Sequence, residues 1–386
     1  MTACKAVSMA ESPKHREISR RLRADIAAGR YPAGARLPSE PQLVKKFGVS
    51  RPTIGRALLD LQSEGLIERR AGSGTYVQGA VAERTPVRML GLLIPGLGGT
   101  EIFEVICGEL AGLARVHDFS LLWGGSSHAQ SGVDIRLEQA GTICDQFIKQ
   151  RLSGVFFAPV ELIPNREQAN RQLAERLRQA GIPVVLLDRD LGLFPKRSDF
   201  DLVGLDNMAA GYLLTEHFLK LGCRRLAFVA RPHSASTVDA RIAGAREALA
   251  RHHIELPPDW VSIGDPTDVK FARSLVAGRR WDTLLCANDH TAAELLRTLV
   301  QSGVRVPGDV RLAGFDDVRY ATLLSPALTT VHQPCRDIAG SAFRALLDRI
   351  AEPTLPARSL LHTPTLVVRE SCGTYMAGGL SSRKRR

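Results

Sequence analysis

Three polar residues in the second half of the chain could bind a small hydroxylated molecule. Arg241 begins a helical stretch, and Asn288 and Asp316 each follow an apolar run. A guanidinium, an amide and a carboxylate that meet in one cleft offer the donors and acceptors that vicinal hydroxyl groups need. An aspartate after a strand often only caps the next helix, and this is the simpler interpretation of Asp289 and Asp317 taken singly. The combination of the first three residues favours a ligand site.

A second group of polar residues, near the N-terminus, could contact DNA. Arg51, Thr53 and Arg56 stand at the start of a pattern that predicts a helix over residues 51–64, because its apolar residues recur at helical spacing. A recognition helix in the major groove uses this end, since short side chains reach phosphates and an arginine can pair with a guanine edge. The sequence therefore predicts a helix that reads DNA.

The elements around this helix are predicted by caps and glycines. Ser39 is a candidate N-cap of the preceding helix, Gly48 closes that helix, and Val49 is expected to be buried in the turn. Residues 66–69 and 74–77 predict the two strands of a small wing, whose glycines allow a close approach to phosphates. The predicted DNA contacts are Ser39, Ser50, Arg51, Pro52, Thr53, Arg56, Gly72, Ser73 and Gly74.

This stretch resembles the GntR family of winged helix-turn-helix regulators. The matching residues are Leu37-Pro38-Ser39-Glu40, Gly48-Val49-Ser50-Arg51, Thr53, Glu64-Gly65-Leu66-Ile67 and Gly72-Ser73-Gly74-Thr75. The chain departs from the family at Pro41 and Gly55, where the family usually has arginines. A glycine inside a helix costs about 1 kcal/mol relative to alanine. The family's base contacts are therefore carried over only in part: either Arg56 takes over some of the readout, or the target sequence differs.

From residue 88 onward, apolar runs alternate with amphipathic helical patterns, and the scheme restarts after Asp206. Short apolar strands separated by helices predict parallel sheets covered on both faces. The restart predicts two similar α/β lobes, and ligands of such folds bind at the carboxyl ends of the strands. The predicted strands cover residues 89–94, 119–123, 154–158, 184–187, 226–230, 283–286 and 310–313.

This second region resembles the effector domain of LacI/GalR regulators, which shares its fold with periplasmic sugar-binding proteins. The matching residues include Leu187-Asp188-Arg189, Arg241-x-x-Gly244, Ala287-Asn288-Asp289 and Gly314-Phe315-Asp316-Asp317. The ligand residues that the resemblance implies are Arg241, Asn288 and Asp316 and, as weaker candidates, Asp190, Phe103 and Glu101. The N-terminal DNA-binding domain, here called the head, is of the GntR type and replaces the DNA-binding domain that the LacI/GalR family usually has. This layout is similar to that of arabinose-repressor-type regulators. The loop at residues 95–100 departs from the family pattern, so the identity of the ligand is not carried over.

The distribution of charge agrees with a DNA-binding N-terminus. The chain has a net charge of +11, and residues 1–82 hold 14 basic against 7 acidic residues. The tail Arg383-Lys384-Arg385-Arg386 supplies the whole of the remaining excess, and the rest of the chain is balanced. Neutralisation of phosphates requires such an excess in the head.

Cysteine usage and hydropathy indicate the compartment. The seven cysteines are scattered without a CxxC motif, and the ten histidines show no spacing typical of metal ligands. We therefore expect reduced thiols, no metal site and a cytoplasmic protein. No apolar run approaches the roughly 18 residues of a membrane span, and the N-terminus lacks an apolar signal core, so no membrane partner is expected.

Two other functions are compatible with part of the sequence. Gly96-x-Gly98 after a strand resembles the start of a dinucleotide-binding motif, but Glu101 occupies the third glycine position and would repel a pyrophosphate. No catalytic acid–base pair, nucleophile elbow or P-loop lysine follows, so neither an enzyme nor a cofactor is expected. The density of head motifs and the missing signal peptide disfavour a solute-binding protein without a DNA role.

The sequence therefore predicts a ligand-responsive transcription regulator, a repressor that binds a palindromic DNA operator as a homodimer. Its effector is expected to be a sugar or sugar derivative. The predicted domains are a winged helix-turn-helix domain at residues 12–78, a linker at 79–87, a two-lobed α/β ligand-binding and dimerisation domain at 88–373, and a disordered basic tail at 374–386.

Overall fold

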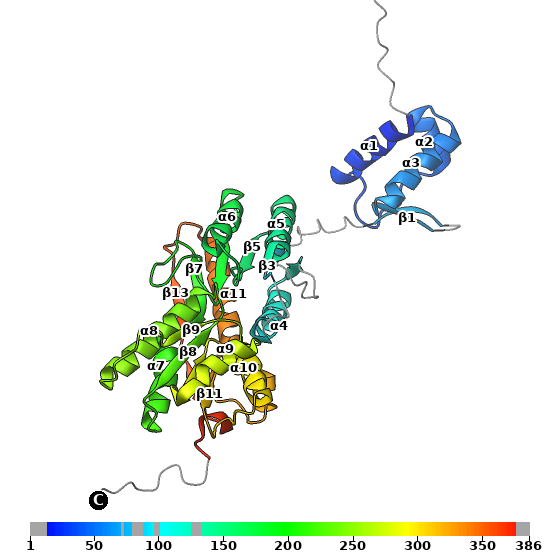
Figure 1. Cartoon of the computed structure of the whole chain (residues 1–386). Helices are drawn as coiled ribbons and strands as arrows, with labels where there is room; N and C mark the ends of the chain where they lie inside the picture. The colour runs from blue at the N-terminus through cyan, green and yellow to red at the C-terminus, as the bar shows by residue number, and fades with distance from the viewer. Residues whose placement is uncertain (1–13, 71–72, 79–87, 96–100, 125–132, 376–386) are drawn as a thin grey trace, which may run out of the picture. The chain divides into compact units, whose positions relative to one another are not determined.

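The chain divides into two compact units, residues 1–87 and 88–386. Each unit has hydrophobic core clusters of its own. The computed structural model (Figure 1) describes residues 14–70, 73–78, 88–95, 101–124 and 133–375. The predictions made for Gly72, for the linker, for residues 96–100 and for most of the basic tail lie outside these ranges.

The N-terminal unit contains three helices and a two-stranded wing. Its elements are α1 (Lys14–Ala27), α2 (Glu40–Phe47), α3 (Arg51–Ser63), β1 (Ile67–Arg70) and β2 (Gly74–Val77). The two strands pair antiparallel, with Ile67 opposite Val77. Leu22, Leu43 and Ile54 come from the three helices and are completely buried in one core. This core gives the start of α3 a defined position within the unit.

Local signals set the helix ends in this unit. The Ser39 backbone N–H donates to Oε1 of Gln42 at 2.8 Å, as in a capping box. Gly48 ends α2 in the left-handed conformation, with φ of 63°, which glycine adopts without strain. Two expectations were wrong in detail. The strand β1 begins at Ile67, one residue late, and Val49 is only half-buried because its turn lies at the edge of this small core.

The C-terminal unit contains two parallel sheets, which confirms the predicted α/β fold class. The strand order is β13-β7-β6-β5-β3-β4 in the first sheet and β11-β10-β8-β9 in the second. The first sheet consists of β3 (Arg88–Leu93), β4 (Phe119–Trp123), β5 (Gly154–Phe157), β6 (Val184–Leu187), β7 (Asp201–Leu205) and β13 (Ser359–His362). The second consists of β8 (Leu226–Ala230), β9 (Val261–Ile263), β10 (Thr283–Cys286) and β11 (Arg311–Ala313).

Helices cover both faces of the first sheet (Figure 1). Phe156 of β5 stacks on Phe343 at 6.3 Å between ring centroids, whereas Val155 and Phe157 belong to the core on the other face. This double burial explains why the strands are uninterrupted apolar runs. The helices of the first lobe are α4 (Glu101–Val116), α5 (Val133–Gln150), α6 (Arg166–Gln179) and α11 (Cys335–Ala351), and those of the second are α7 (Asn207–Lys220), α8 (Ser236–Arg251), α9 (Val269–Val276) and α10 (Asp289–Gln301).

The chain passes between the lobes three times: from β7 to α7, from β12 (Thr330–His332) to α11, and from β13 to β14 (Thr365–Val367). The strands β4, β6, β8 and β10 have the predicted bounds. The strands β7 and β9 were not predicted, nor was the return of α11 and β13 to the first lobe. The crossings bring residues far apart in the sequence to the boundary between the lobes. Within the described ranges, no helix is both long and apolar enough to cross a membrane.

Candidate functional site

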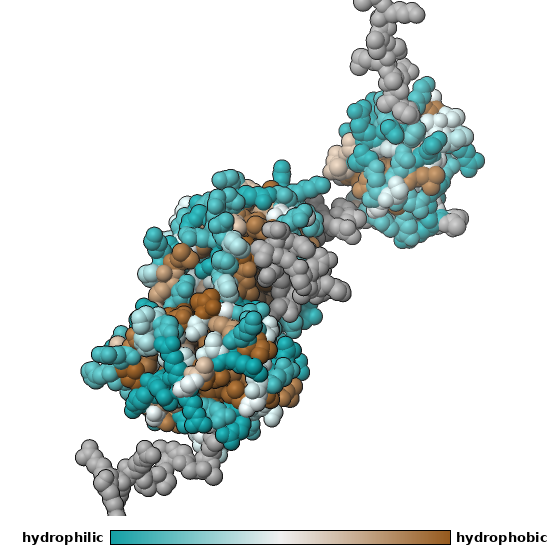
Figure 2. Space-filling model, viewed as in Figure 1, coloured by the Kyte–Doolittle hydropathy of each residue, from teal (hydrophilic) through white to brown (hydrophobic). Residues whose placement is uncertain are grey.

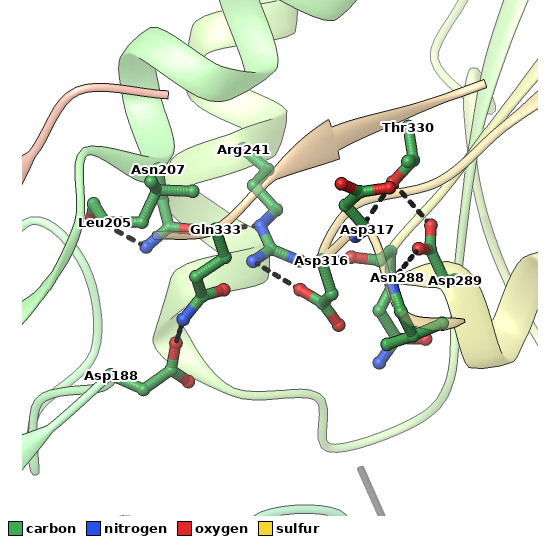
Figure 3. A network of polar contacts seen from close by, with 12 residues as sticks. Asp188, Leu205, Asn207, Arg241, Asn288, Asp289, Asp316, Asp317, Thr330 and Gln333 are labelled. Carbon is green, nitrogen blue, oxygen red and sulfur yellow. Dashed lines mark hydrogen bonds and ion pairs between the residues drawn. The ribbon is translucent and has the colours of Figure 1, made fainter. Parts of the chain in front are cut away.

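Arg241 is the centre of a buried polar network at the strand ends of the second lobe (Figure 3). Its Nε donates to Oδ1 of Asn207 at 2.8 Å, and Nη1 donates to the carbonyl of Ala287 at 2.6 Å. Its Nη2 forms a longer bond, 3.3 Å, to Oδ1 of Asp316. The guanidinium also lies over the ring of Phe315, 4.6 Å from the centroid. Arg241 and Asp316, predicted from the sequence as ligand residues, therefore form an ion pair.

A close crossing of α7 and α8 positions this arginine. Gly211 of α7 faces Arg241, and a Cβ added to this glycine would lie 1.9 Å from the Arg241 carbonyl oxygen. Gly244 of α8 faces the other helix, and its Cβ would lie 1.9 Å from the Met208 carbonyl oxygen. Only glycine fits at both positions, so the two backbones approach closely and Asn207, at the start of α7, can reach Arg241.

Asp316 is held in an unusual state. It is buried, and its φ of 114° is rare for a residue with a side chain. Burial raises its pKa to about 7; Arg241 opposes this rise, and the nearby Asp188 and Glu161 add to it. The carboxylate is therefore poorly compensated inside the protein, a feature that functional sites often show.

Asn288 and Asp289 connect the same strand end to its surroundings. Asn288 is half-buried, and its Oδ1 accepts the Thr291 backbone N–H at 2.8 Å, which caps α10. Asp289 accepts from the Thr330 hydroxyl at 2.6 Å and from the Val318 N–H at 3.1 Å. Burial raises the pKa of Asp289 well above its ordinary value. Asn288 thus lies next to the network but, among the described contacts, serves as a helix cap.

The first lobe contributes a second polar cluster, around Asp188, whose residues were not among the predicted ligand contacts. Asp188 directly follows β6, is buried, and has φ of 66°. Its carboxylate accepts from Gln333 Nε2 at 3.0 Å and from Arg189 Nε at 3.1 Å, and Arg189 also pairs with Glu161 at 2.5 Å. Asp188 stands in the Leu187-Asp188-Arg189 motif at a strand end, but Asp190 was the residue chosen there as a ligand candidate. No local signal pointed to Gln333.

The three weaker candidates have separate surroundings. Asp190 accepts from the backbone N–H groups of Gly192 and Ser198 at 3.3 and 3.2 Å, so it holds its own loop. Phe103 is buried, with the Arg189 guanidinium 5.4 Å from its ring centroid. Glu101, the first residue of α4, accepts the Arg319 backbone N–H at 2.7 Å and so links the two lobes.

Two cavities adjoin the network. The larger one, here the α4 cavity, has a volume of about 760 Å³ and is lined by Glu101, Ile102, Asp316, Tyr320, Gln333 and Cys335, among others. The smaller one, here the α7 cavity, has a volume of about 230 Å³ and is lined by Asp188, Asp190, Lys196, Arg197, Asn207 and Met208, among others. The polar residues around Arg241 thus border both cavities.

In the N-terminal unit, Arg51 is a predicted DNA contact that is both charged and accessible. Its side chain is 77% exposed, and its Nε lies 3.1 Å from Oε2 of Glu40. Glu40 also pairs with Arg69 of the wing, so one carboxylate holds an arginine of the recognition helix and one of the wing. Glu40 belongs to the family motif, but neither Glu40 nor Arg69 was among the predicted DNA contacts. Together these residues place two guanidinium groups at the start of α3.

The remaining predicted contacts surround this point. The Ser50 and Thr53 hydroxyls are 2.8 Å apart, and Pro52 and Arg56 are exposed. Gly74, with φ of 124°, passes close to the Arg36 side chain. Hydrophilic residues cover most of the visible face of this unit (Figure 2). Ser39 contributes to the start of α2, and the Ser73 hydroxyl lies 2.8 Å from that of Tyr76.

Family models match both units. The model of bacterial regulatory proteins of the gntR family matches residues 14–77, and that of the periplasmic binding protein-like domain matches residues 215–372. The chain is 25% identical over 371 residues to the arabinose metabolism transcriptional repressor of Geobacillus stearothermophilus, covering 93% of this chain and 97% of the relative. It is 31% identical to the repressor PurR of Photobacterium profundum, covering 52% of this chain and 66% of that protein.

Solved structures agree with these matches. The transcriptional regulator CelR in complex with cellobiose is 25% identical, with a TM-score of 0.62 over 84% of this chain and 91% of that one. A structure from Sanguibacter keddieii assigned to the LacI family of transcriptional regulators is 31% identical, with a TM-score of 0.57 over 74% of this chain and 99% of that one. The chain belongs to the ligand-responsive, DNA-binding transcription regulators that join a GntR-type winged helix-turn-helix head to a LacI/GalR-type effector domain.

Proposed function

We propose that this regulator is a repressor that binds a palindromic operator as a homodimer and responds to a sugar bound between its lobes. The observation that carries the proposal is the buried pair of Arg241 and Asp316, which borders a cavity at the strand ends. Buried donors and acceptors of this kind discriminate between ligands by their hydroxyl groups. One relative is named for arabinose metabolism and another structure holds cellobiose, which supports a sugar as the class of effector.

The domain limits that we propose are a DNA-binding domain at residues 12–78, a linker at 79–87, an effector and dimerisation domain at 88–373 and a basic tail at 374–386. The protein is proposed to act in the cytoplasm without catalysing a reaction. A two-fold dimer presents two heads to two matching half-sites. The effector changes DNA affinity only as far as it binds the two states of the protein with different affinity.

The DNA-binding half of the proposal is tested with Arg51→Ala. DNA selected from a random library by the wild-type protein serves as the probe in a gel-retention assay. Loss of this exposed guanidinium is expected to weaken binding by about 1–3 kcal/mol. Arg305→Ala is the matched control, because the Arg305 side chain is also 77% exposed and also pairs with one carboxylate, but it lies in the effector unit. Equal DNA affinity of Arg51→Ala and the control would contradict the assigned contact.

The effector half is tested with Asp316→Asn, which keeps the shape of the side chain and removes its charge. Calorimetry against L-arabinose, D-ribose and cellobiose measures binding, and gel retention shows whether a binding sugar alters DNA affinity. We expect the variant to lose at least about tenfold in sugar affinity, or about 1.4 kcal/mol, and with it the sugar's effect on DNA. A variant that responds to the sugar like the wild type would refute the site.

A further inference from the structure

Glu40 binds two arginines that come from different elements of the head. Its Oε2 accepts a hydrogen bond at 3.1 Å from Nε of Arg51, the first residue of α3, and its Oε1 accepts one from Nη2 of Arg69 in β1. The Glu40 side chain is 19% exposed, whereas those of Arg51 and Arg69 are 77% and 35% exposed. One half-buried carboxylate therefore holds two more accessible guanidinium groups.

The alternation of side chains along β1 explains why Arg69, and not the next arginine, reaches Glu40. Successive side chains of a strand point to opposite faces. Ile67 is buried in the core of the head, so Arg69, two residues later, lies on the face that is turned to the helices. Arg70 lies on the other face and pairs there with Glu68 at 3.1 Å. The two neighbouring arginines of the wing thus have different surroundings.

The backbone before α2 fixes Glu40 relative to the wing. The Leu37 N–H donates to the Thr75 carbonyl at 2.8 Å, and the Val77 N–H donates to the Ala35 carbonyl at 2.8 Å. Glu40 itself stands in the first turn of α2, where the positive end of the helix dipole favours a carboxylate. The place of this carboxylate is therefore set by the fold of the head and not only by the two arginines.

Both guanidinium groups keep donors for DNA. In side-chain hydrogen bonds to described residues, Arg51 uses only Nε and Arg69 only Nη2. The two Nη groups of Arg51 remain, and such a fork can pair with the O6 and N7 atoms of guanine. Two guanidinium groups on one carboxylate also leave positive charge in excess, which attracts phosphates. A guanidinium that is held in place before DNA arrives loses less conformational freedom on binding.

We propose that Glu40 is a positioning residue that holds Arg51 and Arg69 as a pair for the operator, and that Arg69 contacts the DNA from the wing. This inference rests on the proposed DNA-binding function and deepens it, because it adds a contact from β1 and names the residue that orients both arginines. Arg70, on the opposite face of β1, has no part in this pair.

Glu40→Gln separates positioning from a simple effect of charge, because the two have opposite signs. If the carboxylate only repelled phosphates, its removal would strengthen binding to every DNA. Positioning predicts instead that the ratio of affinities for the selected DNA and for random DNA of the same length falls about tenfold. Both DNAs report on the same folded fraction, so partial unfolding of the variant does not change this ratio. An unchanged or increased ratio would overturn the positioning role.

The matched control for this variant is Glu68→Gln. It removes the same charge from the same unit, and Glu68 also pairs with an arginine of the wing. We expect its ratio of affinities to equal that of the wild type in gel retention with the full chain. An equal fall of the ratio in Glu40→Gln and Glu68→Gln would show that the loss of any carboxylate in this unit is sufficient, and would contradict the special role of Glu40.

Arg69→Ala tests the new contact directly. We expect it to weaken binding to the selected DNA about tenfold or more. Arg70→Ala, which removes the same charge from the opposite face of β1, should weaken binding less. Combined with Glu40→Gln, Arg69→Ala should lose less than the sum of the two single losses, since Glu40 acts in part through Arg69. Equal affinities of Arg69→Ala and Arg70→Ala, or additive losses in the double variant, would overturn the inference.

The wild type distinguishes failure of this inference from failure of the proposed function. A wild-type protein that selects no DNA from the random library would refute the DNA-binding function itself. If the wild type selects DNA while Glu40→Gln and Arg69→Ala behave like their controls, only the inference about Glu40 and Arg69 is refuted.

Discussion

At the scale of single residues, Asp316 shows how the protein combines strain with buried charge. Its φ of 114° and its burial both cost free energy, and Arg241 offsets only part of the cost. Such a residue persists where the surrounding structure holds it and where a bound molecule uses it. Asp309 is the opposite case: it is only half-buried, and Arg305 holds its pKa well below the ordinary range.

The raised pKa of Asp316 makes a testable contribution to stability. Its pKa in the folded chain is about 7, against about 3.9 for an unfolded aspartate. Between these values the folded chain holds the extra proton, so the contribution of this group to the free energy of unfolding falls as pH rises from about 4 to about 7. Urea unfolding at pH 5 and pH 8 should show the wild type losing more stability than Asp316→Asn, by at least about 1 kcal/mol.

The control for this measurement is Asp309→Asn. Because the pKa of Asp309 lies below its ordinary value, its titration is complete before pH 5, and this variant should keep the wild-type difference between the two pH values. An identical pH dependence in the wild type and Asp316→Asn would show that the carboxyl group of Asp316 is not perturbed in this direction.

At the scale of elements, the crossing of α7 and α8 positions the candidate site. The glycines at the crossing let the backbones touch, and each helix then presents one member of the pair formed by Asn207 and Arg241. The neighbours of these glycines are backbone atoms, which cannot move aside as a flexible side chain can. The crossing therefore requires glycine at positions 211 and 244 whether or not a ligand is bound.

Gly244→Ala is expected to destabilise the effector unit by about 3 kcal/mol, because overpacking of a well-packed core costs this much. Ligand affinity should also fall, since the displaced α8 carries Arg241. Gly340→Ala in α11 is the matched control: no atom lies within 4 Å of the added Cβ, and helix propensity alone should stabilise it by up to about 1 kcal/mol. Equal melting temperatures for the two variants would contradict the close crossing.

At the scale of the whole molecule, the two units have separate cores. Among the residues that the structure describes, the core of the N-terminal unit draws on residues between Ile18 and Val77, and the other two core clusters draw on residues from Met89 onward. Each unit can therefore keep its fold when the other is absent. The three crossings between the lobes, in contrast, tie residues 88–375 into one unit that cannot be cut without loss.

A fragment of residues 88–386 is accordingly expected to fold and to bind the same sugars as the full chain with unchanged affinity. It should no longer retain the selected DNA on a gel. Circular dichroism and calorimetry check the first two outcomes, and gel retention checks the third. Loss of cooperative unfolding in the fragment would mean that the head is part of the effector core. Retained DNA binding would place the DNA contacts outside the head.

The sequence by itself determined the parts of this protein that depend on neighbouring residues. Periodicity and caps predicted α2, α3 and the bounds of β4, β6, β8 and β10, because those signals act within a few residues. The strand-end rule likewise identified Asp316, and the combination of residue types identified Arg241, which the structure pairs with it. The motifs that resemble the GntR and LacI/GalR families predicted the DNA-binding domain and the effector domain.

Only the tertiary structure decided which polar groups meet. The sequence interpretation chose Asp190, but the left-handed turn at Asp188 leaves Asp190 to hold its own loop, while Asp188 bonds to Gln333. These partners are 145 residues apart, and the bond exists because α11 and β13 return to the first lobe. No local pattern encodes such a return, since its free energy comes from burial between distant segments. The Gln333 Oε1, which has no hydrogen-bond partner among the described residues, is likewise visible only in the folded chain.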